Sequence, residues 1–168
     1  MHKYILFDLD GTLTDPGLGI TNAVMYALKK FNIEVPDRSE LYKFIGPPLL
    51  ESFEKYYGMT QEQSQMALQY YREYFKPYGL YENTVYDGIE ELLVTLKAQG
   101  KKLILATSKP EPFAVEILRH FGLDKYFDFV AGATMDEKRV HKADVIAYAL
   151  ESCKITELTE AIMIGDRE

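Results

Sequence analysis

The sequence is poor in cysteine, in positive charge and in long apolar runs, and each shortage excludes a class of protein. Cys153 is the only cysteine among 168 residues. No disulfide can form within the chain, so we expect the reducing cytoplasm as its compartment. No run of 18 apolar residues is present, which excludes a membrane-spanning helix. The first apolar stretch meets two aspartates before any small-residue cleavage site, so it is not a signal peptide.

Acidic residues outnumber basic residues by 26 to 19, which gives a formal charge of −7. That average field repels a nucleic-acid backbone, and no stripe of Lys and Arg reverses it locally, so we expect no nucleic-acid partner. Small anionic substrates stay compatible with this charge if a metal ion or a few placed cations receive them. With 47% hydrophobic and 13% aromatic residues, the chain can bury a core, which excludes intrinsic disorder.

Short apolar runs with the length of buried strands alternate with helical patterns in most of the chain. The run KYILF at 3–7 is too short for a helix and ends at an acidic turn with glycine. Asp87 is the expected N-cap of a helix that ends at Gly100. Strands alternating with helices predict an α/β fold with a doubly wound parallel sheet. The expected strands are 3–7, 102–106, 127–133 and 161–165, and further helices are expected up to Gly122 and over 141–152.

The region between the first strand and residue 84 predicts helices only. Apolar residues recur at helical spacing from Gly17 to Phe31. Thr60 and Gln63 form a capping box at the start of another helix. The sequence therefore predicts a core made of residues 1–14 and 85–168, interrupted by an all-helical domain over 15–84. The other helices expected in this domain are 38–45, 49–57 and 60–76.

Polar side chains follow each expected strand, at the edge where open parallel sheets bind ligands. A cluster of carboxylates needs a cation, and a site with oxygen ligands suits Mg²⁺. A hydroxyl and a lysine beside it favour a phosphate dianion. One carboxylate could attack phosphorus, while a second could protonate the leaving oxygen and later activate water. These side chains belong to Asp8 and Asp10 after the first strand, Thr107, Ser108 and Lys109 after the second, Lys142 behind the third, and Asp166 after the fourth.

Four of these segments, in order, resemble the motifs of the haloacid dehalogenase superfamily. DLDGTLT at 8–14 resembles motif I, and ILATSKP at 104–110 resembles motif II. Lys142 fits the lysine of motif III, and IMIGDRE at 162–168 resembles the start of the GDxxxD form of motif IV. The helical region lies where the family inserts its C1 cap. The resemblance, closest to phosphoglycolate phosphatases, implies the HAD-like core and a phosphatase activity.

The resemblance also implies a role for each matching residue. Asp8 would be the nucleophile that forms an aspartyl-phosphate, and Asp10 the general acid and then the base. Thr107 would bind a phosphoryl oxygen, and Lys142 would neutralise charge between that oxygen and Asp8. Mg²⁺ would be held by the Asp8 carboxylate, the Asp10 backbone carbonyl and Asp166.

Three further residues are candidates for binding the phosphate or substrate. Ser108 and Lys109 follow Thr107, and Gly46 lies in KFIGPPL, which resembles the specificity turn of the cap. Each has a plain structural alternative. Thr107 or Ser108 could instead cap the next helix, Lys109 could be solvated, and the Gly-Pro-Pro segment could simply connect two helices rigidly.

The sequence departs from the family pattern at two places. Ala143 follows Lys142 where the family usually has proline. The second acid of GDxxxD would lie beyond Glu168, where the chain stops. The sequence is therefore expected to be a fragment of a longer protein, with a metal shell and a sheet edge incomplete.

The expected function is Mg²⁺-dependent hydrolysis of a small phosphorylated metabolite. A 5′-nucleotidase and a β-phosphoglucomutase-like phosphotransferase are alternatives within the family. An inactive fragment or partner-binding remnant is the alternative from a different class. A bacterial receiver domain is excluded, because its phospho-accepting aspartate follows a later strand and no helical insertion follows its first strand. No feature of the sequence predicts an oligomeric state.

Overall fold

The computed structural model describes residues 2–166, which divide into two compact units. The α/β unit contains the residues up to Asp15 and those from Val85 onward, and the helical unit is the continuous segment Pro16–Thr84. None of the described helices combines the length and apolar character needed to cross a membrane.

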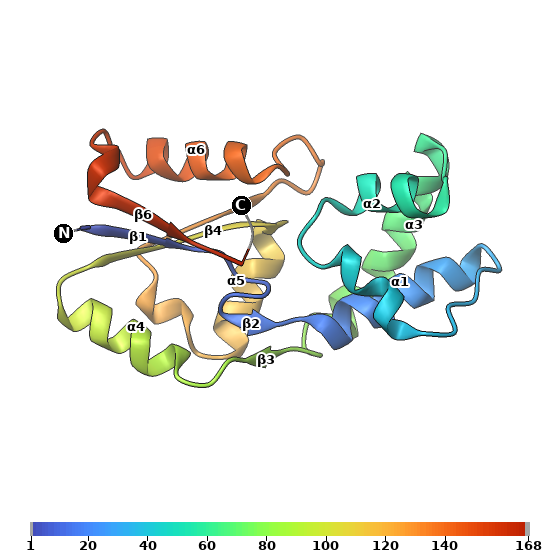
Figure 1. Ribbon diagram of the computed structural model, residues 1–168, viewed down its shortest axis with the longest axis horizontal. Helices are drawn as coiled ribbons and strands as arrows, with labels where there is room; N and C mark the ends of the chain where they lie inside the picture. The colour runs from blue at the N-terminus through green and yellow to red at the C-terminus, as the bar shows by residue number, and fades with distance from the viewer. Residues whose placement is uncertain (1, 167–168) are drawn as a thin grey trace. The chain divides into compact units, whose positions relative to one another are not determined.

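The α/β unit is built on a four-stranded sheet in the order β5-β4-β1-β6, with parallel pairing throughout (Figure 1). Leu6 of β1 pairs with Ile104 of β4 on one side and with Met163 of β6 on the other. The predicted α/β fold with a doubly wound parallel sheet is confirmed. The strands are β1 (Tyr4–Phe7), β4 (Lys102–Pro110), β5 (Phe129–Ala133) and β6 (Ala161–Ile164).

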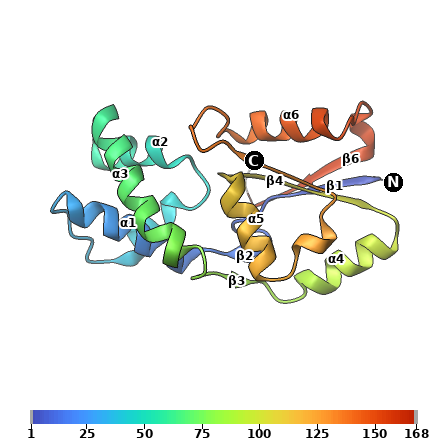
Figure 2. The same ribbon diagram turned by 180° about the vertical axis from the view of Figure 1, so that it is seen from behind.

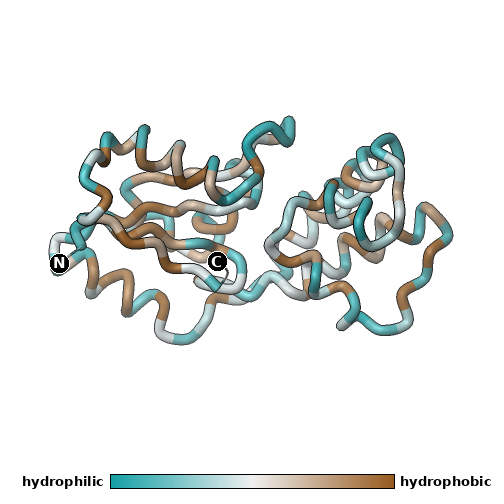
Figure 3. The backbone as a smooth tube through the Cα atoms, turned by 45° about the horizontal axis from the view of Figure 1, so that its top comes forward, coloured by the Kyte–Doolittle hydropathy of each residue, from teal (hydrophilic) through white to brown (hydrophobic). Residues whose placement is uncertain are grey.

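Helices cover both faces of this sheet, which explains why its inner strands are continuous apolar runs rather than alternating ones. Helix α6 (Lys142–Ser152) lies on one face, and α4 (Ile89–Ala98) and α5 (Glu111–His120) lie on the other (Figures 1 and 2). The tube in Figure 3 is mostly brown along the strands of this unit. The buried cluster under α6 consists of Leu6, Ile104, Ala106, Ala131, Val145, Ala149 and Ile155.

The structure corrects three details of this unit. Strand β4 does not end at residue 106 but continues to Pro110, with a register shift after Ala106. Gly88, at φ 80°, is the N-cap of α4 and no side chain caps the helix, so the expected cap by Asp87 is wrong. Strand β6 is not fully buried, since Ile162 and Ile164 are 39% and 38% exposed.

The helical unit packs its helices around one another through aromatic and small side chains. The expected capping box is confirmed, because the Gln63 N–H donates to Thr60 Oγ1 at 3.2 Å and the Thr60 N–H donates to Gln63 Oε1 at 2.9 Å. Residues 38–44 form a 3₁₀ helix rather than an α-helix. The elements are α1 (Gly17–Lys30), η1 (Arg38–Phe44), α2 (Leu49–Tyr57), α3 (Gln61–Tyr74) and the π-helical turn η2 (Phe75–Gly79).

Short elements complete the chain. Strands β2 and β3 pair with each other, and both are only two residues long. The sequence pattern did not predict them, because two residues are too few to show a period. They are β2 (Thr14–Asp15) and β3 (Thr84–Val85), and the 3₁₀ turns are η3 (Asp124–Tyr126) and η4 (Leu158–Glu160).

Two glycines let α1 and the turn after α3 meet backbone to backbone. A Cβ placed on Gly19 would lie 1.9 Å from the carbonyl oxygen of Gly79, and one on Gly79 would lie 2.9 Å from the carbonyl oxygen of Gly19. The Gly19 N–H also donates to the carbonyl oxygen of Glu82 at 3.0 Å. At Gly19 the three nearest atoms are all backbone, which cannot move aside as a flexible side chain can, whereas at Gly79 the Phe75 ring lies as close as the backbone, at 2.9 Å.

We expect Gly19→Ala to lower the thermal unfolding temperature, although alanine is the better helix former by about 1 kcal/mol. Overpacking costs about 1–3 kcal/mol, which outweighs that gain. The control is Gly58→Ala, where a Cβ would meet nothing within 4 Å and only the left-handed φ of 62° opposes the change. Differential scanning calorimetry of both variants gives the comparison. A Gly19→Ala protein as stable as the wild type would contradict the close approach.

Candidate active site

The turn after β1 brings two buried carboxylates to the edge of the sheet. The Leu9 carbonyl oxygen accepts hydrogen bonds from three successive N–H groups, those of residues 12–14, at 2.9–3.2 Å. Gly11 adopts φ 79°, the left-handed conformation that the turn requires. Asp8 and Asp10 on this turn are each 8% exposed. Such burial is costly for a carboxylate unless a cation or hydrogen bonds compensate it.

Asp8 is compensated on both of its oxygens. Its Oδ1 accepts the Leu9 N–H at 2.7 Å, and its Oδ2 lies 2.5 Å from Lys142 Nζ. Lys142 Nζ also donates to the Ala106 carbonyl oxygen at 3.2 Å. Because Ala106 lies within β4 and Asp8 follows β1, the single ammonium joins the end of β1 to the neighbouring strand.

Asp10 is compensated by a different lysine. Lys109 Nζ lies 2.9 Å from Asp10 Oδ2, and the two side chains are only 5% and 10% exposed. Burial raises the pKa of Asp10 above its ordinary value, and Lys109 opposes that rise. The second oxygen, Oδ1, is buried without a hydrogen-bond partner among the described residues. The Asp10 carboxyl therefore holds a proton more readily than a solvent-exposed aspartate does. Its Oδ1 can accept a hydrogen bond from a further partner.

Thr107 and Ser108 lie in the part of β4 that the sequence pattern placed in a loop. Thr107 is 2% exposed, and its Oγ1 accepts the Lys109 N–H at 3.1 Å. Helix α5 starts after Pro110 without any side-chain cap. The alternative that Thr107 or Ser108 caps this helix is therefore wrong, and within residues 2–166 the Thr107 hydroxyl acts as an acceptor.

Asp166 approaches the same turn from the end of β6. A Cβ on Gly11 would lie 2.5 Å from Asp166 Oδ2, so the carboxylate occupies the space that any side chain at position 11 would take. The pairing of Phe7 with Ile164 accounts for this approach, since it brings the ends of β1 and β6 side by side. Glycine at position 11 thus serves both the turn and the access of a third carboxylate.

The sequence analysis missed the residues that hold the segment before Lys142. Arg139 Nε donates to the Gly132 carbonyl oxygen at 3.0 Å, and its guanidinium stacks 3.7 Å from the ring centre of Tyr148. Glu111 Oε2 accepts the Gly132 N–H at 3.1 Å and lies 3.5 Å from Arg139. These contacts tie the segment to β5, α5 and α6. No spacing in the sequence pairs residues so far apart.

The donor set fits a hard divalent cation that takes oxygen ligands. Lysines already pair with Asp8 and Asp10, and a dication would offset the further negative charge that an incoming phosphate brings. No group of three or more His, Cys, Asp or Glu side chains poised for a metal is found within residues 2–166. The expected ligand set does not require such a group, because it combines two carboxylates with a backbone carbonyl.

Gly46 belongs to the helical unit, where it follows η1 at φ 102° in the Gly-Pro-Pro turn. Its part in substrate binding stays a prediction.

A sequence model described as haloacid dehalogenase-like hydrolase matches residues 5–168. The chain belongs to the haloacid dehalogenase-like hydrolases. The match covers all the polar residues that follow the strands, here called the strand-end cluster: Asp8, Asp10, Thr107, Ser108, Lys109, Lys142 and Asp166. The resemblance in motifs I to IV is confirmed at the level of the family.

Three relatives of this haloacid dehalogenase-like hydrolase are the most informative. A 5′-nucleotidase of Pseudomonas aeruginosa is 48% identical over 97% of the chain and 73% of its own length. The tyrosine-protein kinase PtkA of Mycobacterium tuberculosis is 40% identical over 98% of the chain and 56% of its own length. A crystal structure described as a predicted phosphatase from Clostridium acetobutylicum shares 54% identity and a TM-score of 0.97, over 99% of the chain and 77% of its own.

The phosphoglycolate phosphatase of Colwellia psychrerythraea is more distant, at 29% identity over 98% of the chain and 76% of its own length. The family, the 5′-nucleotidase and the Clostridium acetobutylicum structure identify the chain as a phosphatase-type member of the haloacid dehalogenase-like hydrolases. The predicted family and enzyme class are confirmed, whereas the names of the relatives differ in substrate.

Proposed function

We propose that the chain hydrolyses the phosphate ester of a small metabolite through a phosphorylated Asp8. The observation that carries this proposal is the placement of Asp8 Oδ2 at 2.5 Å from Lys142 Nζ, at the end of β1. A carboxylate held against a cation is positioned as a nucleophile, and the same cation can receive the charge of a phosphoryl oxygen. The buried Thr107 hydroxyl is a second donor for that oxygen.

In the first step, an Asp8 oxygen forms a bond to phosphorus while the bond from phosphorus to the ester oxygen breaks. Asp10 donates its proton to that leaving oxygen, which departs as an alcohol. The raised pKa of Asp10 suits this role, because part of its population keeps a proton nearer to neutrality. In the second step, water attacks phosphorus and gives a proton to Asp10. Inorganic phosphate leaves and the Asp8 carboxylate is restored.

We propose Mg²⁺ as the cofactor, held by the Asp8 carboxylate, the Asp10 backbone carbonyl and Asp166. Bound there, it would neutralise charge on the phosphoryl group. Support comes from the approach of Asp166 to Gly11 and from an all-oxygen donor set.

We expect chelation to abolish activity. EDTA treatment should remove phosphate release, and added Mg²⁺ should restore it, whereas Zn²⁺ should restore little because the donor set contains no nitrogen or sulfur. The measurement is phosphate release against free metal concentration. Full activity in metal-free buffer would rule out the metal-assisted mechanism.

We further propose that residues 15–84 serve as the cap that the family resemblance implies, and that Gly46 lies in its specificity turn. The single cysteine favours a reducing compartment such as the cytoplasm.

Nucleoside 5′-monophosphates are the first substrates to test. The relative named 5′-nucleotidase is 48% identical to the chain, against 29% for the relative named phosphoglycolate phosphatase. The test is a phosphate-release screen over nucleotides, phosphoglycolate, sugar phosphates and pyrophosphate, run in H₂¹⁸O. Incorporation of ¹⁸O into phosphate would show hydrolysis. Transfer to a sugar phosphate would favour the β-phosphoglucomutase-like alternative, and no turnover with any substrate would favour the partner-binding remnant.

A further inference from the structure

The helical unit carries a hollow whose walls are mainly tyrosine. It is a wide-open hollow of about 510 Å³, lined by Tyr74, Pro77, Tyr78, Tyr81 and Glu82. Tyr78 is 61% exposed and Tyr81 is 43% exposed. The rings of Tyr74 and Tyr78 are tilted against each other, with their centroids 5.5 Å apart. Aromatic surface of this extent, left open to solvent around one charged residue, is characteristic of a ligand site rather than of a core.

Glu82 is the one charged residue of the lining, and it forms no ion pair with a lysine or arginine within residues 2–166. Its Oε2 accepts the amide N–H of Asn22 at 2.8 Å, while its Oε1 is buried and accepts no hydrogen bond within residues 2–166. The nearby guanidinium of Arg38 donates instead to Thr21 Oγ1 and Asn22 Oδ1, at 2.6 and 2.7 Å. A carboxylate oxygen withdrawn from water without a partner is costly, and a cation in the hollow would offset that cost.

Tyr74 stays a neutral phenol beside this carboxylate. Burial raises its pKa above the ordinary value of 10.0, and the interaction with Glu82 raises it further. The wall of the hollow therefore carries one negative charge and the electron-rich faces of neutral rings.

We propose that this hollow binds a small organic ammonium ion. Aromatic faces attract a cation through the ring quadrupole, and a carboxylate adds direct charge attraction. An alkylated ammonium is favoured over an inorganic cation, because its apolar groups gain from contact with the rings while a metal ion would lose its water there. An anion or a neutral sugar would find neither attraction. The proposed site uses no residue of the strand-end cluster, so it is independent of the proposed hydrolysis.

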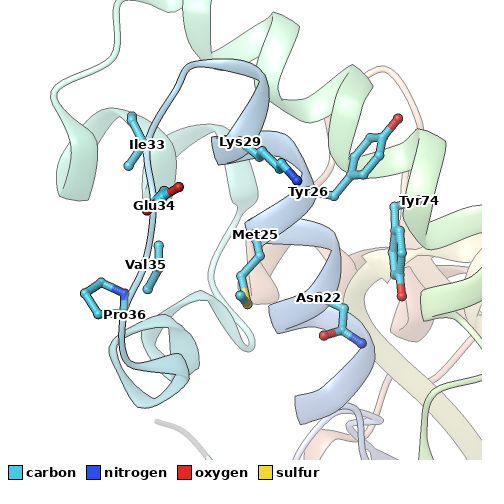
Figure 4. Close-up of a pocket in the computed structure, with 9 residues that line it drawn as sticks. All are labelled: Asn22, Met25, Tyr26, Lys29, Ile33, Glu34, Val35, Pro36 and Tyr74. Carbon is cyan, nitrogen blue, oxygen red and sulfur yellow. The ribbon is translucent and has the colours of Figure 1, made fainter.

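A neighbouring hollow in the same unit differs in chemistry and supplies the control. It measures about 520 Å³, shares Tyr74 with the tyrosine hollow and carries both a lysine and a glutamate, Lys29 and Glu34, beside several aliphatic side chains (Figure 4). Charges of both signs there give no preference for a cation. Glu34→Gln therefore removes the same charge as Glu82→Gln from the same unit while leaving the tyrosine hollow intact.

The test compares choline with its neutral carbon isostere, 3,3-dimethylbutan-1-ol, by titration of the whole chain followed through the tyrosine ring signals in NMR. We expect choline to shift the signals of Tyr78 and Tyr81, assigned through single Phe substitutions, and the neutral isostere to bind at least tenfold more weakly. Glu82→Gln should weaken choline binding at least tenfold, whereas Glu34→Gln should change it less than twofold. Thermal unfolding of each variant confirms that the fold is retained.

Three results would overturn the proposal. They are the absence of saturable shifts with choline up to 100 mM, equal binding of choline and the alcohol, and an equal loss of affinity in the two glutamate variants. The last would show attraction by the general negative field rather than a built site.

Discussion

Asp8→Asn is expected to abolish turnover, by three orders of magnitude or more, while the fold persists. An amide oxygen can still accept the Leu9 N–H that Asp8 Oδ1 accepts at 2.7 Å. The ion pair with Lys142 is lost, but the lysine keeps the Ala106 carbonyl oxygen and is 31% exposed, so we expect the fold to persist. The amide is a poor nucleophile and carries no charge, so no acyl phosphate forms. Removal of an essential nucleophile costs several orders of magnitude in rate. The measurements are steady-state kcat and the hydroxylamine-sensitive phosphoenzyme trapped after mixing with substrate.

The matched control is Asp87→Asn, which makes the same chemical change at an exposed turn of the same unit. Turnover in this variant should stay within twofold of the wild type. An Asp8→Asn protein that keeps a tenth or more of wild-type kcat would refute the covalent role.

Lys109→Met is expected to lower the free energy of unfolding by about 3–5 kcal/mol at neutral pH, the usual cost of removing one partner of a buried ion pair. Lys109 Nζ lies 2.9 Å from Asp10 Oδ2, and both side chains are almost fully buried. Methionine fills a similar volume, so the loss reports charge rather than a cavity. Urea unfolding in metal-free buffer gives the measurement.

The loss of stability in Lys109→Met is expected to depend on pH and to be larger at higher pH. Burial raises the pKa of Asp10 above its ordinary 3.8, so the native state binds this proton more tightly than the unfolded chain does. As the pH rises from 3.8 through the raised pKa of Asp10, ionisation of this carboxyl therefore lowers the free energy of unfolding. Lys109 offsets that cost only while Asp10 is charged. The deficit of Lys109→Met should be largest above the raised pKa of Asp10 and should shrink as the pH falls below it.

A double variant separates charge from packing. Asp10→Asn in the Lys109→Met background removes the uncompensated carboxylate and should recover most of the lost stability at neutral pH. A double variant no more stable than Lys109→Met alone would show that the ion pair is not the source of the loss.

The parallel sheet was predictable because each inner strand is buried on both faces and is therefore a short apolar run. The full length of β4 was not predictable, because residues 107–109 are polar and their pattern is typical of a loop. They stay extended because Thr107 and Lys109 turn inward toward polar partners at the sheet edge.

The approach of Lys142 to Asp8 and of Asp166 to Gly11 follows from topology, since parallel strands bring their carboxyl ends to one edge. The pairing of Lys109 with Asp10 does not follow from topology. It depends on the register shift after Ala106, which sets the direction of Lys109, and sequence patterns do not encode such a shift. For that reason the sequence left a solvated lysine open, which is wrong because Lys109 is buried as a counter-ion of Asp10, while its part in phosphate binding stays a prediction.

The pairing of β2 with β3 has a consequence for engineering and for evolution. The helical unit is one uninterrupted stretch, and the two strands through which the chain enters and leaves it are hydrogen-bonded neighbours. Any foreign segment whose own ends lie side by side could replace it without rethreading the sheet. The architecture thus permits modular exchange, in which the helical segment is traded between lineages while Asp8, Thr107 and Lys142 of the α/β unit stay untouched.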